Sequence, residues 1–369
     1  VTQATSLTYG GSISGTGGLT KMGAQTLTLS GSNTYSGTTA INAGGLTTSA
    51  ANRLSDSSDI VLADFVGAVL TLGGSDTVGS LSGGGAAGGN VVLGANTLTV
   101  TQNSAQVYGG IISGTGGLTK AGLSTLTLSG ANTYTGATTI NAGVLATGAA
   151  ERIANTSDII MANVAGGELS LGGNETIRSL SGGGATGGNI SLGAFTLTVT
   201  QSTALTYSGA ISGTGGLTKA GTQTLTLGGT NTYTGVTTIN AGILSTNAPE
   251  RISDSSDIVL ANVANAGLLL GGNETVGSIS GGGTTGGNIN LGVFTLKVTQ
   301  NAVQTYGGII SGTGGLTKAG SQTLILSGAN TYTGATTIDA GTLSTSTANR
   351  IADTSDVVFS NFAGANLTL

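Results

Sequence analysis

The chain of 369 residues has a formal net charge of −5, only 7% charged residues, and neither histidine nor cysteine. An acidic chain without a basic cluster excludes nucleic acid as a partner, because phosphates are bound by rows of Lys and Arg side chains. The missing His and Cys exclude disulfides, imidazole and thiolate metal sites, and nucleophilic catalysis by Ser-His or Cys-His pairs.

The remaining composition predicts an ordered, all-β protein. There are 69 glycines and one proline, yet 38% of the residues are apolar, which is too many for a disordered linker. β-Branched residues are abundant and the charged helix formers are rare, which favours strands. The apolar runs are only a few residues long, so no membrane-spanning helix is expected.

The whole chain repeats with a period of 99 residues. The sequence GTGGLTK begins at residues 15, 114, 213 and 312, without insertion or deletion between the copies. A period that covers the chain predicts a repeat architecture. We predict one continuous solenoid over residues 1–369, built of repeats 1–99, 100–198, 199–297 and an incomplete 298–369. Because the last repeat stops partway, we also expect further repeats in a longer chain.

The predicted strands of the first repeat are short and closely spaced. In chain order they cover residues 7–9, 12–14, 19–21, 26–29, 38–41, 45–48, 59–63, 68–72, 78–81, 90–93 and 97–101. Many alternate apolar residues with Thr or Ser, and Gly or Asn separates them, as expected for strands joined by tight corners. With about three strands per turn, each repeat makes four or five turns of roughly 20–25 residues. A string of immunoglobulin-like sandwiches would need longer strands, an aromatic core residue and linkers.

One part of each repeat resembles a known family. The pattern GGLTKAG..TLTLSGANTYTG.TTINAGVL is similar to the autotransporter-associated β-strand repeat of Gram-negative passenger proteins and large adhesins, and residues 171–200, LGGNETIRSLSGGGATGGNISLGAFTLTVT, resemble the sequence between such repeats. The resemblance implies a right-handed parallel β-helix that is secreted and displayed on the outer bacterial surface. It implies no catalytic residues, because a structural and export-related repeat defines the family.

Carboxylates recur at two offsets and are the remaining candidates for chemistry. Such a pair suits acid–base catalysis or Ca²⁺, but the second repeat carries Asn at one of the two offsets, and the dense calcium-binding nonapeptide is missing. We therefore expect no catalytic, cofactor-binding or metal-binding residues, although Ca²⁺ near Asp56 and Asp59 stays open. An Arg six residues before the Asp that every repeat keeps favours an ion pair that closes the loop. The residues concerned are Asp56 and Asp59, Asn155 and Asp158, Asp254 and Asp257, and Asp353 and Asp356, with Arg53, Arg152, Arg251 and Arg350.

Two further patterns have a structural and a functional interpretation. SGTGGLTK resembles a phosphate-binding loop, but Thr precedes its Lys, at 21, 120, 219 and 318, and another strand follows, so glycine corners explain it better. Two sets of Tyr, at 9, 108, 207 and 306 and at 35, 134, 233 and 332, could stack on sugars. Single Tyr residues at this spacing more often pack in a core or cap a corner.

These observations together predict a non-enzymatic protein without a cofactor. We expect a stalk or fibre segment of a large secreted or surface-displayed bacterial adhesin, which gives reach, rigidity and adhesion or self-association. The expected partners are a host or neighbouring-cell surface, matrix polysaccharide, or copies of the chain itself. The alternative is a carbohydrate-binding or polysaccharide-degrading β-helix. A degrading enzyme needs a unique cleft, and a nearly identical tandem array offers no unique position.

Overall fold

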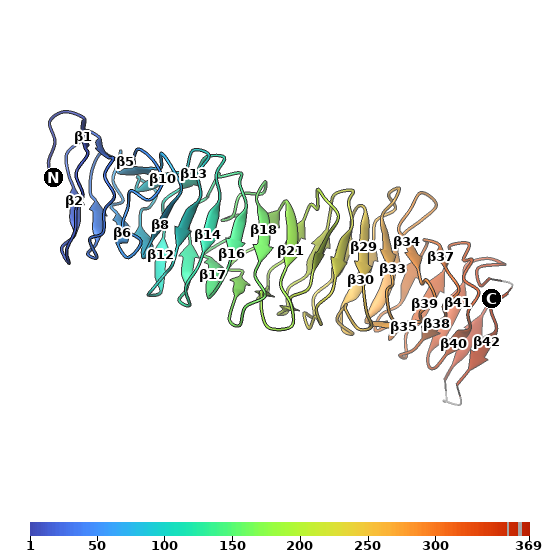
Figure 1. Cartoon of the computed structure of the whole chain (residues 1–369). Coiled ribbons are helices and arrows are strands. Elements are labelled where there is room, and N and C mark those ends of the chain that lie inside the picture. Colours follow the sequence, from blue (N-terminus) through green and yellow to red (C-terminus); the bar gives the residue numbers. More distant parts are fainter. Residues whose placement is uncertain (353, 361–363) are drawn as a thin grey trace. The chain divides into compact units, whose positions relative to one another are not determined.

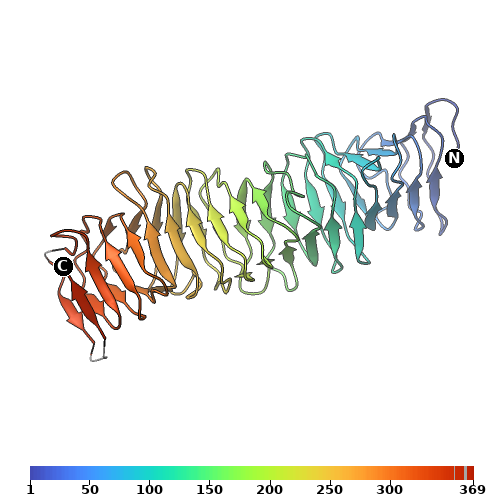
Figure 2. The same ribbon diagram turned by 180° about the vertical axis from the view of Figure 1, so that it is seen from behind.

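The computed structural model describes residues 1–352, 354–360 and 364–369, and in these ranges the regular elements are strands, with no helix. The chain divides into two compact units. The first contains Val1–Arg178 and Thr186–Ser191, and the second contains Ser179–Ala185 and Leu192–Leu369. In each unit the strands stack in parallel, one turn upon the next (Figure 1), and the same stacking is visible from behind in Figure 2. The all-β parallel solenoid predicted from the sequence is confirmed.

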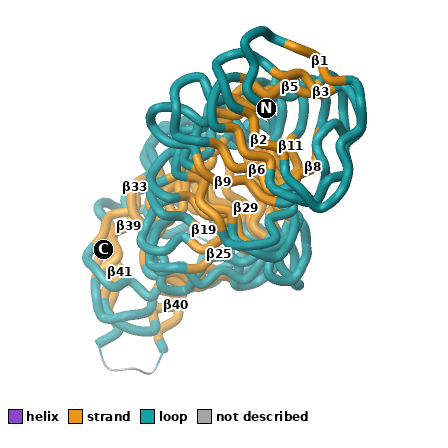
Figure 3. Tube along the Cα trace, turned by 90° about the vertical axis from the view of Figure 1, so that its left-hand side faces the viewer, coloured by secondary structure: helices purple, strands orange, loops and turns teal. Residues whose placement is uncertain are grey.

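The first unit contains three stacks of parallel strands. The first stack is β1 (Leu7–Tyr9), β3 (Leu27–Leu29), β5 (Gly45–Thr48), β7 (Val69–Thr71), β10 (Asn90–Val92) and β13 (Ile112–Ser113). The second is β2 (Leu19–Lys21), β4 (Thr39–Ile41), β6 (Asp59–Leu62), β9 (Ser80–Gly83), β12 (Gln106–Tyr108), β15 (Leu126–Leu128), β17 (Val144–Thr147), β19 (Glu168–Ser170) and β22 (Asn189–Ser191). The third is β8 (Asp76–Val78), β11 (Leu98–Val100), β14 (Leu118–Lys120), β16 (Thr138–Ile140) and β18 (Asp158–Met161), and the unit also holds β20 (Glu175–Ile177). Figure 3 labels β2, β6 and β9 of the second stack, in which β4 lies between β2 and β6.

The second unit repeats this arrangement. Its first stack is β21 (Ser179–Gly182), β24 (Leu205–Tyr207), β27 (Leu225–Leu227), β29 (Ile243–Thr246), β31 (Gly267–Leu269), β34 (Asn288–Asn290) and β37 (Ile310–Ser311). Its second is β23 (Leu197–Val199), β26 (Leu217–Lys219), β28 (Thr237–Ile239), β30 (Asp257–Leu260), β33 (Ser278–Gly281), β36 (Gln304–Tyr306), β39 (Thr323–Leu326), β41 (Thr342–Thr345) and β43 (Asn366–Thr368). Its third is β32 (Glu274–Val276), β35 (Leu296–Val298), β38 (Leu316–Lys318), β40 (Thr336–Ile338) and β42 (Val357–Phe359), and the unit also holds β25 (Ile211–Ser212).

A sequence repeat does not make a whole number of turns. In the second stack of the first unit, strand register runs from residue 21 through 41, 62, 83 and 108 to 128. After five turns the residue in register with Lys21 is therefore Leu128, whereas the residue at the same offset of the next repeat is Lys120. At about 21 residues per turn, the segment from Lys120 to Leu128 is a little over a third of a turn, and each repeat makes about 4⅔ turns. In the second unit, Leu326 follows Lys219 in register after five turns in the same way.

This fraction moves equivalent segments of successive repeats to different faces of the solenoid. β2 and β14 have the same offset in their repeats, yet they lie in different stacks of the first unit. β15, which has the offset of β3, lies in the stack of β2. The same shift separates β26 from β38 in the second unit. The prediction of four or five turns per repeat is thus confirmed, with the fraction as an addition.

The core consists of the inward residues of these short strands. Along the first stack, Leu46, Leu70, Val91 and Ile112 pair in register and are fully buried. Each such side chain contributes about 1.5–3 kcal/mol by leaving water. Corners need glycine where turns approach closely: Gly122 has φ +72°, and a Cβ there would lie 1.4 Å from the carbonyl oxygen of Thr101.

Candidate functional site

A lysine ammonium group lies inside the solenoid in every repeat. Lys120 ends β14 and is fully buried because it points to the same side as Leu118, two residues earlier on the strand. Its Nζ donates to the carbonyl oxygens of Ala121, Gly122 and Ala142 at 2.8, 2.9 and 3.0 Å. The equivalent lysines make the same three bonds: Lys21, Lys219 and Lys318.

This ammonium group is held by backbone dipoles without a carboxylate partner. Burial lowers the pKa of Lys120, Lys219 and Lys318 to about 8, because the interior disfavours the charged form. The three carbonyls belong to the corner that follows the strand and to the corner one turn later. The lysine therefore ties two successive corners together.

A buried carboxyl group plays the complementary role at another corner. Glu175 accepts hydrogen bonds from the backbone N–H groups of Arg152 and Ile153, one turn earlier. Glu274 binds the N–H groups of Arg251 and Ile252 in the same way, and Asp76 binds those of Arg53 and Leu54. Burial raises the pKa of Glu175 and of Glu274 to about 7, and that of Asp76 in the same direction. These carboxyl groups satisfy backbone donors at positions where no strand forms.

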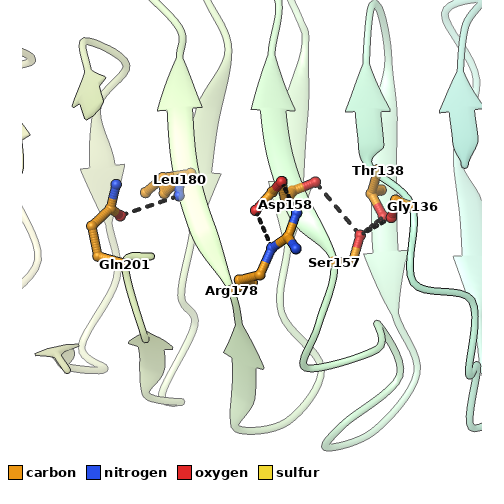
Figure 4. Close-up of polar contacts among 7 residues, drawn as sticks. All are labelled: Gly136, Thr138, Ser157, Asp158, Arg178, Leu180 and Gln201. Carbon is orange, nitrogen blue, oxygen red and sulfur yellow. Dashed lines mark hydrogen bonds and ion pairs between the residues drawn. The ribbon is translucent and has the colours of Figure 1, made fainter. Parts of the chain in front are cut away.

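Seven of the eight tyrosines are internal and do not present sugar-stacking surfaces. Tyr134 is fully buried, and its hydroxyl bonds to Thr138 at 2.6 Å, which bonds to Ser157 at 2.8 Å. Ser157 donates in turn to the carbonyl of Gly136 (Figure 4). The sugar-stacking hypothesis is wrong for these seven residues, all fully buried: Tyr35, Tyr108, Tyr134, Tyr207, Tyr233, Tyr306 and Tyr332. Tyr9 is 44% exposed.

An asparagine two residues before the buried tyrosine connects three successive turns. Asn132 accepts the N–H of Ile112 through Oδ1 at 2.8 Å and donates through Nδ2 to the carbonyl of Arg152 at 2.7 Å. One side chain thereby joins the turn before it to the turn after it. The same bonds recur at Asn33, Asn231 and Asn330.

The predicted pairing of each Arg with its own Asp residues is wrong for Arg53, Arg152 and Arg251. Within the described ranges, the ion pairs join Arg178 to Asp158 and Lys297 to Asp339. Arg178 Nε donates to Asp158 Oδ1 at 2.8 Å (Figure 4). Arg53 instead donates to Ser32 Oγ at 2.8 Å, because its side chain extends toward the preceding turn.

The Asp residues of the predicted pairs bond to the next turn or face solvent. Asp59 accepts a hydrogen bond from Ser80, and Asp257 accepts one from Ser278. Asp353 lies outside the described residues. In the part of the chain that the structure describes, no group of three or more His, Cys, Asp or Glu could hold a metal ion. The polar arrangements of the interior thus suit the joining of turns.

The passenger-associated-transport-repeat family model matches residues 19–47, 118–146, 217–245 and 316–344. Each match begins at the strand that carries the buried lysine and includes the buried asparagine and tyrosine. The chain contains four passenger-associated transport repeats. The "Adhesin BmaC autotransporter" of Brucella suis biovar 1 (strain 1330) is 41% identical over 350 residues, which is 92% of this chain and 10% of that relative. No solved structure matches the chain.

The chain is therefore a β-solenoid segment of the type found in autotransporter adhesin passengers. Passenger repeats imply a secreted or surface-displayed protein. Within the described ranges, no helix is long and apolar enough to cross a membrane. The passenger-repeat segment spans a tenth of the length of the curated relative that it matches.

The internal polar residues of the passenger repeats were missed by the sequence-based interpretation, although a signal for them exists. In LTK, period-two alternation places Leu and Lys on one side and Thr on the other. The same argument places Glu175 beside Ile177, which is buried. Because charged residues are rarely buried, the alternation pattern was not used to place these Lys and Glu side chains in the core.

Proposed function

We propose that this segment is a non-enzymatic stalk of a large bacterial surface adhesin, and that its four repeats form one continuous solenoid. The observation that carries the proposal is a set of internal side-chain hydrogen bonds that recurs in every repeat. The lysine, asparagine and tyrosine at equivalent offsets make the same bonds in all four copies. Such uniformity suits a role in length and rigidity, because nearest-neighbour stacking lets repeats be added without new contact types.

The surface location and partners follow from the same reasoning. Similarity to an autotransporter adhesin supports display on the outer surface of a Gram-negative cell. We propose that the segment belongs to a longer chain that adheres to a host or neighbouring-cell surface, to matrix polysaccharide, or to copies of itself. The repeat then sets the reach: 4⅔ turns at about 4.8 Å per turn give about 22 Å.

Insertion of one additional repeat tests the stalk function. A second copy of residues 100–198 placed after Thr198 preserves every junction, because each repeat ends and begins with the same offsets. Small-angle X-ray scattering should show a maximum dimension that is longer by about 22 Å, the rise of the added turns. Neither form should release reducing sugar from bacterial or host polysaccharides. Growth by about 35 Å, as for an added globular domain of this size, would contradict the proposal. Any catalytic release of sugar would contradict it as well.

A further inference from the structure

The third repeat has a hollow on its outer surface. This hollow contradicts the expectation that a nearly identical tandem array offers no unique position. The hollow has a volume of about 190 Å³ and lies over β29, β31, β34 and β37. It is lined by Ile243, Asn265, Ala266, Gly267, Leu268, Leu269, Asn288, Asn290 and Ser311. All of these residues belong to the second unit.

Strand register explains how the hollow forms. Gly267 lies between Ile243 on the preceding turn and Asn288 on the following turn. These neighbouring strands are about 4.8 Å apart, and both flanking side chains project outward. A Cβ at Gly267 would lie 2.9 Å from the carbonyl oxygen of Asn288 and 3.3 Å from Ile243 Cδ1. The missing side chain of Gly267 therefore leaves a gap, with the 37% exposed Leu269 farther along the same strand.

The residues peculiar to the third repeat gather around this gap. Gly267 occupies the offset of Val69 and Glu168 in the first two repeats, and Leu269 the offset of Thr71 and Ser170. Asn265 stands where the other three repeats have glycine, and its φ of 63° is tolerated by Asn. Asn290 likewise replaces Val92 and Ser191. Substitutions that are scattered along the sequence thus change one surface together.

The amide groups at the rim are oriented by the backbone. Asn288 Oδ1 accepts the N–H of Ile309 at 2.9 Å, and Asn290 Oδ1 accepts the N–H of Gly292 at 2.9 Å. Each amide oxygen is thus occupied, which leaves the Nδ2 groups as fixed donors on the outer face. Among the lining residues none is charged.

We propose that this hollow binds one uncharged sugar ring of a polysaccharide. Ile243 and Leu269 provide the apolar floor for the face of a pyranose, and the three asparagines and Ser311 provide hydrogen-bonding groups for its hydroxyls. Sites for drug-sized ligands begin at roughly 300 Å³. The hollow is smaller than this, so its volume suits a single sugar ring. The open outer face of the sheet allows the rest of the polysaccharide to extend across the strands. The lack of charged lining residues selects against uronic acids and sulfated sugars.

A glycan array that carries neutral and acidic oligosaccharides, probed with the whole labelled chain, tests the proposal. Neutral oligosaccharides should bind. Gly267→Val fills the hollow with the side chain that the first repeat has at this offset, and it should weaken binding at least tenfold. Asn290→Ser keeps the hollow and replaces the amide donor by a shorter hydroxyl that does not reach the ligand, with an expected loss of about fivefold, which corresponds to roughly 1 kcal/mol for one hydrogen bond. Val69→Ala, the matched control in the first repeat, should leave binding unchanged.

A gain-of-site variant makes the test independent of any loss of folding. Gly45→Ile, Gly67→Asn, Val69→Gly, Thr71→Leu and Val92→Asn together should build a second hollow in the first repeat and raise the calorimetric stoichiometry from one to two. Binding confined to acidic glycans, no glycan binding, or equal binding by the Gly267→Val variant would overturn the proposal. So would a Gly267→Val variant that loses protein adhesion but keeps glycan binding, since the hollow would then hold a protein side chain. The stalk function would stand in each of these cases.

Discussion

Replacement of Lys120 by Met is expected to open the second repeat locally. The substitution keeps the length of the side chain and removes three hydrogen bonds to the carbonyls of Ala121, Gly122 and Ala142. A buried acceptor left without a donor costs about 1–3 kcal/mol, so three cost about 6 kcal/mol. The buried ammonium has a cost of its own, since the fall of its pKa from 10.5 to about 8 corresponds to about 3 kcal/mol. The variant should therefore lose about 3 kcal/mol of local stability, the difference between these two terms.

Hydrogen–deuterium exchange resolves this effect within one molecule. Peptides that cover residues 118–146 should exchange roughly 100-fold faster in the variant, since each 1.4 kcal/mol is about a factor of ten. Residues 217–245, where Lys219 is unchanged, serve as the internal control. Lys297→Met is the matched surface variant. Its ion pair with Asp339 is exposed and contributes about 0–1 kcal/mol. Equal exchange in the Lys120→Met and Lys297→Met variants would refute the buried lysine as a stabilising device.

The other expected outcomes concern pH and modularity. Burial raises the pKa of Glu175 and Glu274 from 4.5 to about 7. Between these pH values the native state keeps protons that the unfolded chain has lost. The free energy of unfolding should therefore fall between about pH 4.5 and 7, by on the order of 3 kcal/mol per carboxyl group. Burial lowers the pKa of Lys120, Lys219 and Lys318 from 10.5 to about 8, so the free energy of unfolding should rise again from about pH 8 to 10. Urea unfolding measured across this range should therefore give the lowest stability near pH 7.5. A stability maximum near pH 7.5 would contradict both assignments. Deletion of residues 100–198 joins Thr99 to Val199 and should give a folded chain about 22 Å shorter by small-angle scattering, whereas an aggregated product would show that the repeats are not equivalent.

Much of the architecture could be predicted from the sequence, because the period and the short alternating pieces are strong signals. The fraction of a turn could not be predicted, because the register steps are unequal. The step from Lys21 to Ile41 uses fewer residues than the step from Gly83 to Tyr108. That difference lies in glycine-rich corners, whose path depends on packing against neighbouring turns. The single piece predicted at 78–81 is in fact the end of β8 and the start of β9, separated at Gly79.

The candidate residues were harder to predict than the fold. Asp56 and Asp59 attracted attention as a repeated pair, yet the buried carboxyl group of this repeat is Asp76. The bonds of Asp76 go to backbone groups of a preceding turn, and pairing between turns cannot be counted before the register is known. The hollow at Gly267 was missed for the same reason, because Ile243, Gly267 and Asn288 are neighbours only once successive turns are aligned.

The displacement of equivalent residues by a fraction of a turn is the central claim, and paired spin labels test it most directly. The chain has no cysteine, so Cys pairs at Thr20 with Thr127 and at Thr20 with Thr119 can be labelled without background. Thr20 and Thr127 lie in one stack five turns apart, a separation of about 24 Å. Thr119 is nearer to Thr20 in sequence but lies in another stack. Double electron–electron resonance should therefore give a longer distance for Thr20 with Thr119 than for Thr20 with Thr127, and the reverse order would contradict the account.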